Sequence, residues 1–158
     1  MTVTCSHDPT IARPTATEVD DAISAAVSRI VAAGERMTEP RRRVLELLMA
    51  ASEPVKAYDL ISRFHPDGRV AKPATVYRAL DFLEKFGLIH RLSSISSYVV
   101  CRAKAHRHMA AFLICDCCGL AREIAPPQEV ALRDAANAIG FTMDRVTLEI
   151  HGRCASCA

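Results

Sequence analysis

"KPATVYRALDFLEKFG", residues 72–87, is the stretch that decides the fold of the N-terminal half of the chain. Its apolar residues recur at the three- and four-residue spacing of a buried helix face: Val76, Ala79, Leu80 and Leu83. Pro73 suits the first position of a helix, and Gly87 suits its C-terminal cap. Three further residues lie off the apolar stripe: Thr75, Tyr77 and Arg78. The segment is therefore predicted to be a helix that exposes an aromatic side chain and a cation.

The segments on either side of this helix predict a winged helix-turn-helix. Upstream, the apolar spacing predicts helices over Glu18–Ala33, from Thr38 to the break at Pro54, and over Ala57–Phe64. Thr38 is a residue type that can cap the second of these helices. Downstream, "LIHRLSSISSYVVC" contains two short extended runs about a serine-rich turn, which is typical of a β-hairpin. The order helix, turn, helix, hairpin is that of a winged helix.

The second half of the chain reads as a small α/β unit, which makes the whole chain α+β. "AAFLIC" and "AREI" are predicted strands, a helix follows Pro126 and ends at Gly140, and "FTMDRVTLEIH" is a predicted long strand. We expect four parts: a flexible tail over 1–16, the winged helix over 17–101, a hinge over 102–109, and a small α/β domain over 110–158.

The composition indicates a folded protein of the cytoplasm. Half of the 158 residues are hydrophobic, and no stretch resembles a signal peptide or a membrane span. The net charge is only +2, but Arg36–Arg78 holds nine Lys and Arg against five Asp and Glu. This local excess is modest evidence for a polyanionic partner, since a charge run is more often just a solvated face.

Six of the seven cysteines lie between Cys101 and Cys157, and two pairs have C-x-x-C spacing. Two thiolates at each of two tight turns supply a tetrahedral ligand set for zinc: Cys115, Cys118, Cys154 and Cys157. Cys117 is a rival for one ligand position, although the spacing favours Cys118. A secreted disulfide protein conflicts with the cytoplasmic prediction. A thioredoxin-like site would need a C-x-x-C pair at a helix start within a βαβ unit, and the sequence shows no such context. The sequence predicts a closed structural zinc site.

A second set of potential ligands is spread along the chain: His90, Cys101, His108 and Glu123. Two imidazoles, one thiolate and one carboxylate would also complete a tetrahedral site for a borderline-soft ion. Their spacing alone is not specific, because a lone histidine or cysteine more often has an ordinary structural role.

Several motifs together resemble the ferric uptake regulator family, and most closely its zinc-responsive branch. These motifs are "TEPRRRVLELL", "AYDLI", "KPATVYRALDFLEKFGLIHRL", "SYVVC", "FLICDCCG" and "HGRCASC", and they occur in the family's order. The resemblance covers about Val19 to Cys157. It implies a dimeric, metal-dependent transcriptional repressor with an N-terminal winged helix and a C-terminal dimerisation domain. It also implies operator DNA as the partner, no enzymatic activity, no small-molecule substrate and no membrane association.

The resemblance assigns roles to individual residues. It matches the C-x-x-C cysteines to the family's structural zinc, and His90, Cys101, His108 and Glu123 to a regulatory zinc, so that we expect about two zinc ions per chain. It matches five positions to the DNA-binding surface or its neighbourhood: Tyr58, Arg78, Tyr77, Thr75 and Arg41. Ala111, Phe112 and Val146 stand where some members carry further ligands, so that an additional metal site is not expected.

Three rival interpretations remain. The same fold could respond to iron or manganese, although the Cys101 thiolate favours zinc. Oxidation of Cys117 or Cys101 could make the protein a peroxide sensor. A dithiol oxidoreductase built on Cys115 and Cys118 would lose both thiols to zinc. The sequence leaves open the operator, the zinc affinity, and the roles of Cys117, Cys5, His7 and His106.

Overall fold

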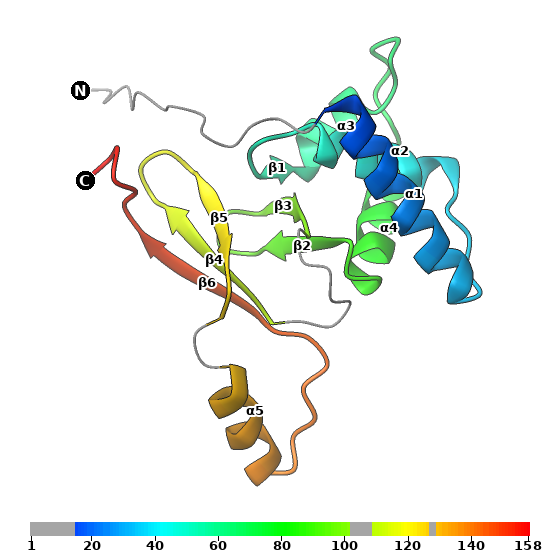
Figure 1. Cartoon of the computed structure of the whole chain (residues 1–158). Coiled ribbons are helices and arrows are strands. Elements are labelled where there is room, and N and C mark those ends of the chain that lie inside the picture. Colours follow the sequence, from blue (N-terminus) through cyan, green and yellow to red (C-terminus); the bar gives the residue numbers. More distant parts are fainter. Residues whose placement is uncertain (1–14, 102–108, 127–128) are drawn as a thin grey trace. The chain divides into compact units, whose positions relative to one another are not determined.

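The computed structural model describes residues 15–101, 109–126 and 129–158. The chain divides into two compact units, of which the first ends at Cys101. The first unit is mainly helical with a small sheet, and the second is built on a three-stranded sheet (Figure 1). The predicted hinge falls almost wholly on residues 102–108, and the predicted tail almost wholly on residues 1–14, which lie outside the described part.

Four helices of the first unit occupy the segments that the apolar spacing predicted. They are α1 (Ala16–Ala32), α2 (Glu39–Met49), α3 (Ala57–Arg63) and α4 (Pro73–Lys85). Helix α1 begins two residues earlier than predicted, because Thr15 and Glu18 form a capping box in which each side chain bonds the other's backbone N–H. Thr38 does occupy the N-cap position of α2, but its side chain makes no capping hydrogen bond, so the prediction that it caps the helix was wrong in that respect.

The small sheet of the first unit has the order β1-β3-β2, and both pairs are antiparallel. Strands β2 (Ile89–Leu92) and β3 (Ser97–Val100) form the predicted hairpin. The sequence did not predict β1 (Val55–Lys56), because a two-residue strand has no detectable alternation. It pairs with β3 and leads directly into α3, so it joins the helix-turn-helix to the wing.

The core of the first unit draws on all four helices and the sheet. The largest side chains with almost no exposed surface in this unit are Ile23, Ile30, Leu45, Leu60, Leu80, Leu83, Ile89, Leu92, Val44 and Val76. Helix α4 contributes its predicted stripe to this core. Because α4 is held along this stripe, its opposite face is free to present side chains to a partner.

The second unit has a sheet of order β5-β4-β6 beside one helix, α5 (Glu129–Ala138). Strand β4 (Ala110–Cys115) pairs antiparallel with β5 (Ala121–Ile124) and parallel with β6 (Thr147–Gly152). The predicted long strand over 141–151 was too long at its start, because β6 begins only where β4 provides a partner. The predicted helix is described from Glu129 onward, because residues 127–128 lie outside the described part, and no residue of α5 is buried.

Among the residues that the structure describes, no helix has both the length and the apolar character needed to cross a bilayer.

Candidate metal centre and nucleic-acid interface

The two C-x-x-C segments meet because two parallel strands end side by side. Strands β4 and β6 are in register from Ala110↔Thr147 to Cys115↔Gly152, and their carboxyl ends therefore lie at one edge of the sheet. The pairing continues one step further, since the Asp116 N–H donates to the Gly152 carbonyl at 2.9 Å. Each strand thus delivers one C-x-x-C segment to the same place (Figure 1).

The first segment is a tight turn. The Gly119 N–H donates to the Cys115 carbonyl at 2.8 Å, and the Cys115 N–H donates to the Leu120 carbonyl at 2.8 Å. Gly119 has φ +75°, in the left-handed region that favours glycine. A similar short turn closes the second segment, where the Cys157 N–H donates to the Cys154 carbonyl at 2.9 Å. Both turns direct their cysteine pairs inward.

Four sulfur atoms converge at this edge: those of Cys115, Cys118, Cys154 and Cys157, all within 4.8 Å of one another. The Cys118 and Cys154 sulfurs are 3.9 Å apart. Tetrahedral zinc with Zn–S bonds of about 2.3 Å requires sulfur–sulfur edges of about 3.8 Å. The sulfur positions therefore fit a zinc ion, whereas Cys117 is exposed and stands outside this group.

The turn also prepares a thiolate. Backbone N–H groups of Cys154, at 3.3 Å, and Cys118 donate to the Cys115 sulfur and lower the pKa of that thiol to about 6. At Cys118 the Leu120 N–H lowers the pKa, but burial and the side chains of Cys115 and Cys154 outweigh it, so the pKa lies above its ordinary value. A cysteine whose pKa is lowered by backbone N–H groups gives up its proton more readily, which suits the binding of a divalent cation by thiolates.

A side-chain contact joins the same two strand ends. His151 on β6 and Asp116 after β4 are linked by a hydrogen bond of 2.7 Å between Nδ1 and Oδ1. The pair is exposed, so it adds to the backbone contacts between the strands without replacing them. His151 is thus a hydrogen-bonded residue beside the cysteines, and it is not one of the four converging ligands.

Two of the four expected regulatory ligands belong to the hairpin of the first unit. His90 on β2 is buried, and it lies on the same face of the hairpin as Cys101, because Cys101 is hydrogen-bonded opposite Leu88. A ligand nitrogen of His90 and the Cys101 sulfur are within 4.8 Å of each other. Glu123 lies on β5 of the second unit, opposite Phe112 of β4. His108 lies outside the described residues.

The residues matched to DNA contacts are mostly on the surface of the helix-turn-helix. Tyr77 and Arg78 are exposed on α4, and Thr75 is half-buried near its start. Tyr58, near the start of α3, is 77% exposed, which is unusual for an aromatic side chain unless it has a partner. These two helices therefore present two tyrosines and one arginine that the core does not use.

Arg41 differs from the other residues of this set. Its guanidinium lies over the Phe82 ring, with Cζ 3.3 Å from the ring centroid, and it donates a hydrogen bond to the Arg36 carbonyl. This stacking joins α2 to α4 inside the unit. The sequence could not distinguish this use of an arginine from a contact with DNA.

A profile of the ferric uptake regulator family matches residues 32–151, which cover three quarters of the chain. This chain belongs to the ferric uptake regulator family. The match spans most of the winged-helix unit and nearly all of the second sheet, including the first C-x-x-C segment. Membership confirms both the resemblance and the predicted α+β fold.

Curated relatives within the family include zinc uptake regulation proteins. That of Escherichia coli (strain K12) is 39% identical over 124 residues, which cover 77% of this chain and 72% of the relative. That of Mycobacterium tuberculosis (strain CDC 1551 / Oshkosh) is 30% identical over 127 residues, which cover 80% of this chain and 97% of the relative. A ferric uptake regulation protein of Klebsiella pneumoniae is also 30% identical, over 128 residues, covering 78% and 80%.

Solved structures of family members are similar as well. A zinc uptake regulator complexed with zinc and DNA superposes with a TM-score of 0.80 at 33% identity, covering 90% of this chain and 95% of that one. The holo form of the protein called XcZur has a TM-score of 0.73 at 38% identity, and the match covers 86% of this chain and 96% of that one.

Proposed function

We propose that this member of the ferric uptake regulator family is a zinc-responsive transcriptional repressor that binds operator DNA as a homodimer and controls zinc uptake genes. The observation that carries the proposal is its similarity, over both units, to a zinc uptake regulator solved with zinc and DNA. The converging thiols of Cys115 and Cys118 also argue against a dithiol enzyme, because zinc would occupy both sulfurs.

The four-cysteine group is the proposed structural zinc site. Zinc would supply a tetrahedral link between four thiolates, with no position open for a substrate. The chain positions these thiolates through the parallel β4–β6 pairing and the two tight turns. The link would join residues separated by 36 positions in sequence, so it would close the C-terminal segment onto the end of β4.

The proposed regulatory zinc site comprises His90, Cys101, His108 and Glu123. The support within the first unit is the shared hairpin face of His90 and Cys101 and the short distance between their ligand atoms. A thiolate among the ligands favours zinc over iron or manganese, because soft sulfur binds zinc more strongly than it binds those harder ions. We therefore place the iron- or manganese-responsive function second.

The DNA interface is proposed to be the exposed face of α4 together with the start of α3. Helix α4 would enter the major groove, where Arg78 would donate two hydrogen bonds to the O6 and N7 of a guanine. Tyr58, Tyr77 and Thr75 would add base or phosphate contacts, and Arg41 would act chiefly by holding α2 against α4. If zinc strengthens operator binding, the operator must strengthen zinc binding by the same factor.

Dimerisation is proposed to use the second unit. Several large apolar side chains are exposed there on or near α5: Val130, Leu132, Ile139 and Phe141. A partner copy would cover apolar surface that a monomer leaves in water. Sedimentation of Ile139→Asp should show a shift from dimer toward monomer relative to the unchanged chain, and an unshifted dimer would place the interface elsewhere.

The experiment that tests the function combines metal analysis with DNA binding. We expect about two zinc ions per chain, one of which a mild chelator removes, and we expect operator affinity to fall when that ion is removed. Cys101→Ser should hold about one ion and bind DNA weakly, whereas Cys117→Ser, a matched thiol outside both sets, should behave like the unchanged protein. Equal DNA affinity of the zinc-loaded and chelated proteins would contradict the proposal.

A further inference from the structure

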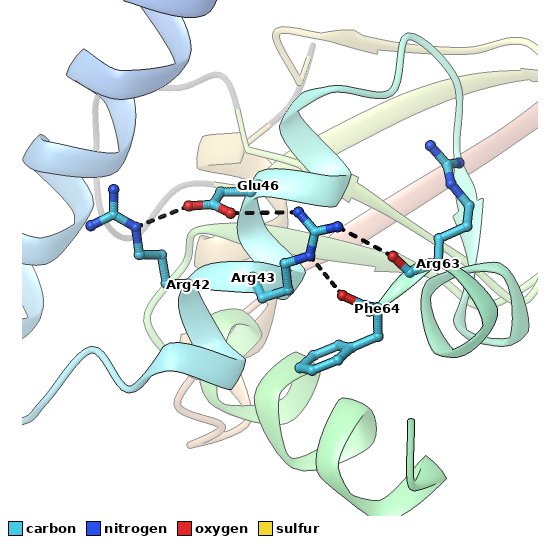
Figure 2. Close-up of polar contacts among 5 residues, drawn as sticks. All are labelled: Arg42, Arg43, Glu46, Arg63 and Phe64. Carbon is cyan, nitrogen blue, oxygen red and sulfur yellow. Dashed lines mark hydrogen bonds and ion pairs between the residues drawn. The ribbon is translucent and has the colours of Figure 1, made fainter. Parts of the chain in front are cut away.

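The carboxyl end of α3 is held by an arginine from another helix. The last carbonyl groups of a helix have no partner within it, and an arginine can supply their hydrogen bonds. The Arg43 side chain, on α2, donates from Nε to the Phe64 carbonyl at 2.8 Å and from a terminal nitrogen to the Arg63 carbonyl at 3.3 Å. Figure 2 shows the guanidinium reaching both carbonyl groups at once.

The same guanidinium is also paired with a carboxylate. Its second terminal nitrogen lies 3.8 Å from Glu46, which at the same time binds the Nε of Arg42 at 2.9 Å (Figure 2). The Arg43 side chain is 29% exposed, whereas that of Arg42 is 52% exposed. These neighbours carry the same charge and share a carboxylate, but Arg43 donates hydrogen bonds to α3, whereas the hydrogen bond from Arg42 to Glu46 stays within α2.

The end of α3 is the point from which the chain turns toward α4. Phe64 is buried, and the turn that follows it returns to α3 where the Ala71 N–H donates to the Ile61 carbonyl at 3.2 Å. Helix α4 begins two residues later, at Pro73. The bonds from Arg43 and the bond from Ala71 therefore hold the carboxyl end of α3 and the segment that leads into α4.

We propose that Arg43 is a positioning residue for DNA binding, which sets the geometry between α3 and α4 by holding the carboxyl end of α3. This inference rests on the proposed function, since it concerns the helix-turn-helix surface assigned there. In this role Arg43 directs two of its hydrogen-bond donors to α3 inside the unit and does not serve as a phosphate contact. Its effect reaches DNA through the placement of residues such as Tyr58 and Arg78.

A positioning residue and a phosphate contact respond differently to salt. Loss of one phosphate contact reduces the slope of log affinity against log salt by about one. Loss of a positioning residue lowers affinity at every salt concentration and leaves the number of phosphate contacts, and hence the slope, unchanged. The basic segment around Arg43 makes the phosphate contact the obvious rival explanation.

The test compares Arg43→Gln with the matched control Arg42→Gln, each titrated against operator DNA in the zinc-loaded state across a range of salt concentrations. We expect Arg43→Gln to lose about tenfold in affinity, the value of a charge-assisted hydrogen bond, with an unchanged slope. Arg42→Gln should stay within about twofold at the salt concentration of the cell. A reduced slope for Arg43→Gln, or equal losses in the two variants, would overturn the inference.

A second measurement does not depend on DNA. Hydrogen exchange of the segment that contains Ala71 should be about tenfold faster in Arg43→Gln and unchanged in Arg42→Gln, and equal exchange in both would refute the role of Arg43. If Arg43→Gln does not fold, as judged by circular dichroism, Arg43→Lys replaces it. Lysine keeps the charge but lacks the planar fork that reaches two carbonyl groups, so faster exchange is still expected. Should the unchanged protein fail to bind DNA, the proposed function fails while the exchange result still tests Arg43.

Discussion

The two units of this chain are held together in different ways. The first has a continuous apolar core to which four helices and a hairpin contribute. In the second, the buried side chains among the residues that the structure describes belong to β4 and the residue before it, and α5 buries none of its residues. The second unit instead brings four cysteine sulfurs together at the end of its sheet. A small unit that cannot bury enough apolar surface commonly depends on a metal or a partner for its stability.

The same difference between the two units suggests a different proposed function for each. The first unit can expose Tyr58, Tyr77 and Arg78 because its core is complete without them. The second unit exposes apolar residues near α5 that would favour association. One unit therefore suits recognition of DNA, and the other suits zinc binding and dimerisation.

Removal of the structural zinc should have the largest effect, and it should be confined to the second unit. Zinc bound to a four-cysteine site supplies on the order of 10 kcal/mol that becomes folding free energy. We expect Cys118→Ser to abolish protection from hydrogen exchange in β4 and β6 while the core helices stay protected. Cys117→Ser is the matched control. Equal loss of protection in the two variants would show that the assignment of Cys118, rather than Cys117, as the ligand is wrong.

A cavity in the apolar core should have the next largest effect, in the opposite unit. Leu80 on α4 is fully buried, so Leu80→Ala should reduce the free energy of unfolding of the first unit by about 2–5 kcal/mol. Urea unfolding followed by circular dichroism measures this change, and the zinc content of the purified protein should not alter. Val31→Ala, at an exposed valine of α1, should cost less than about 0.5 kcal/mol.

Gly119→Ala should destabilise the four-cysteine site moderately. No atom lies within 4 Å of the position a Cβ would take, so the cost arises from φ +75° alone and should be about 1–2 kcal/mol. The expected result is weaker zinc retention in competition with a chelator. Gly152→Ala is the control, because a Cβ at Gly152 would also meet no atom within 4 Å and Gly152 has no positive φ. If Gly152→Ala loses zinc as readily as Gly119→Ala, the positive φ of Gly119 is not the cause of the loss.

The smallest effect is expected at the exposed pair of His151 and Asp116. His151→Asn should change the stability of the second unit by less than about 1 kcal/mol, because an exposed pair of hydrogen-bonded side chains contributes little and salt screens any electrostatic part of it. Thermal unfolding at low and high salt is the measurement. A loss of several kcal/mol would mean that this contact, rather than the backbone pairing and the sulfurs, holds the two strand ends together.

Much of the fold could be predicted because its signals are local. The helix boundaries of the first unit follow from apolar spacing with Pro73 and Gly87 as end signals, and α4 lies where they place it. Two predictions failed where the structure depends on a distant partner. Strand β6 is shorter than its alternating sequence suggested because β4 pairs only with Thr147–Gly152, and β1 was missed because it exists only as a partner of β3.

By itself, the sequence determined the amphipathic helices, the hairpin and the two C-x-x-C pairs, since each depends on residues a few positions apart. Only the tertiary structure decided which of these elements pair or pack together and which side chains those contacts use. The parallel pairing of β4 with β6 brings sulfurs from distant segments to 3.9 Å, and packing of α2 against α3 and α4 uses Arg43 and Arg41 inside the unit. The physical reason is that an arginine or a cysteine has the same local sequence signal whatever its partner. Its partner comes from a segment far away in sequence and is fixed only when the two segments pack together.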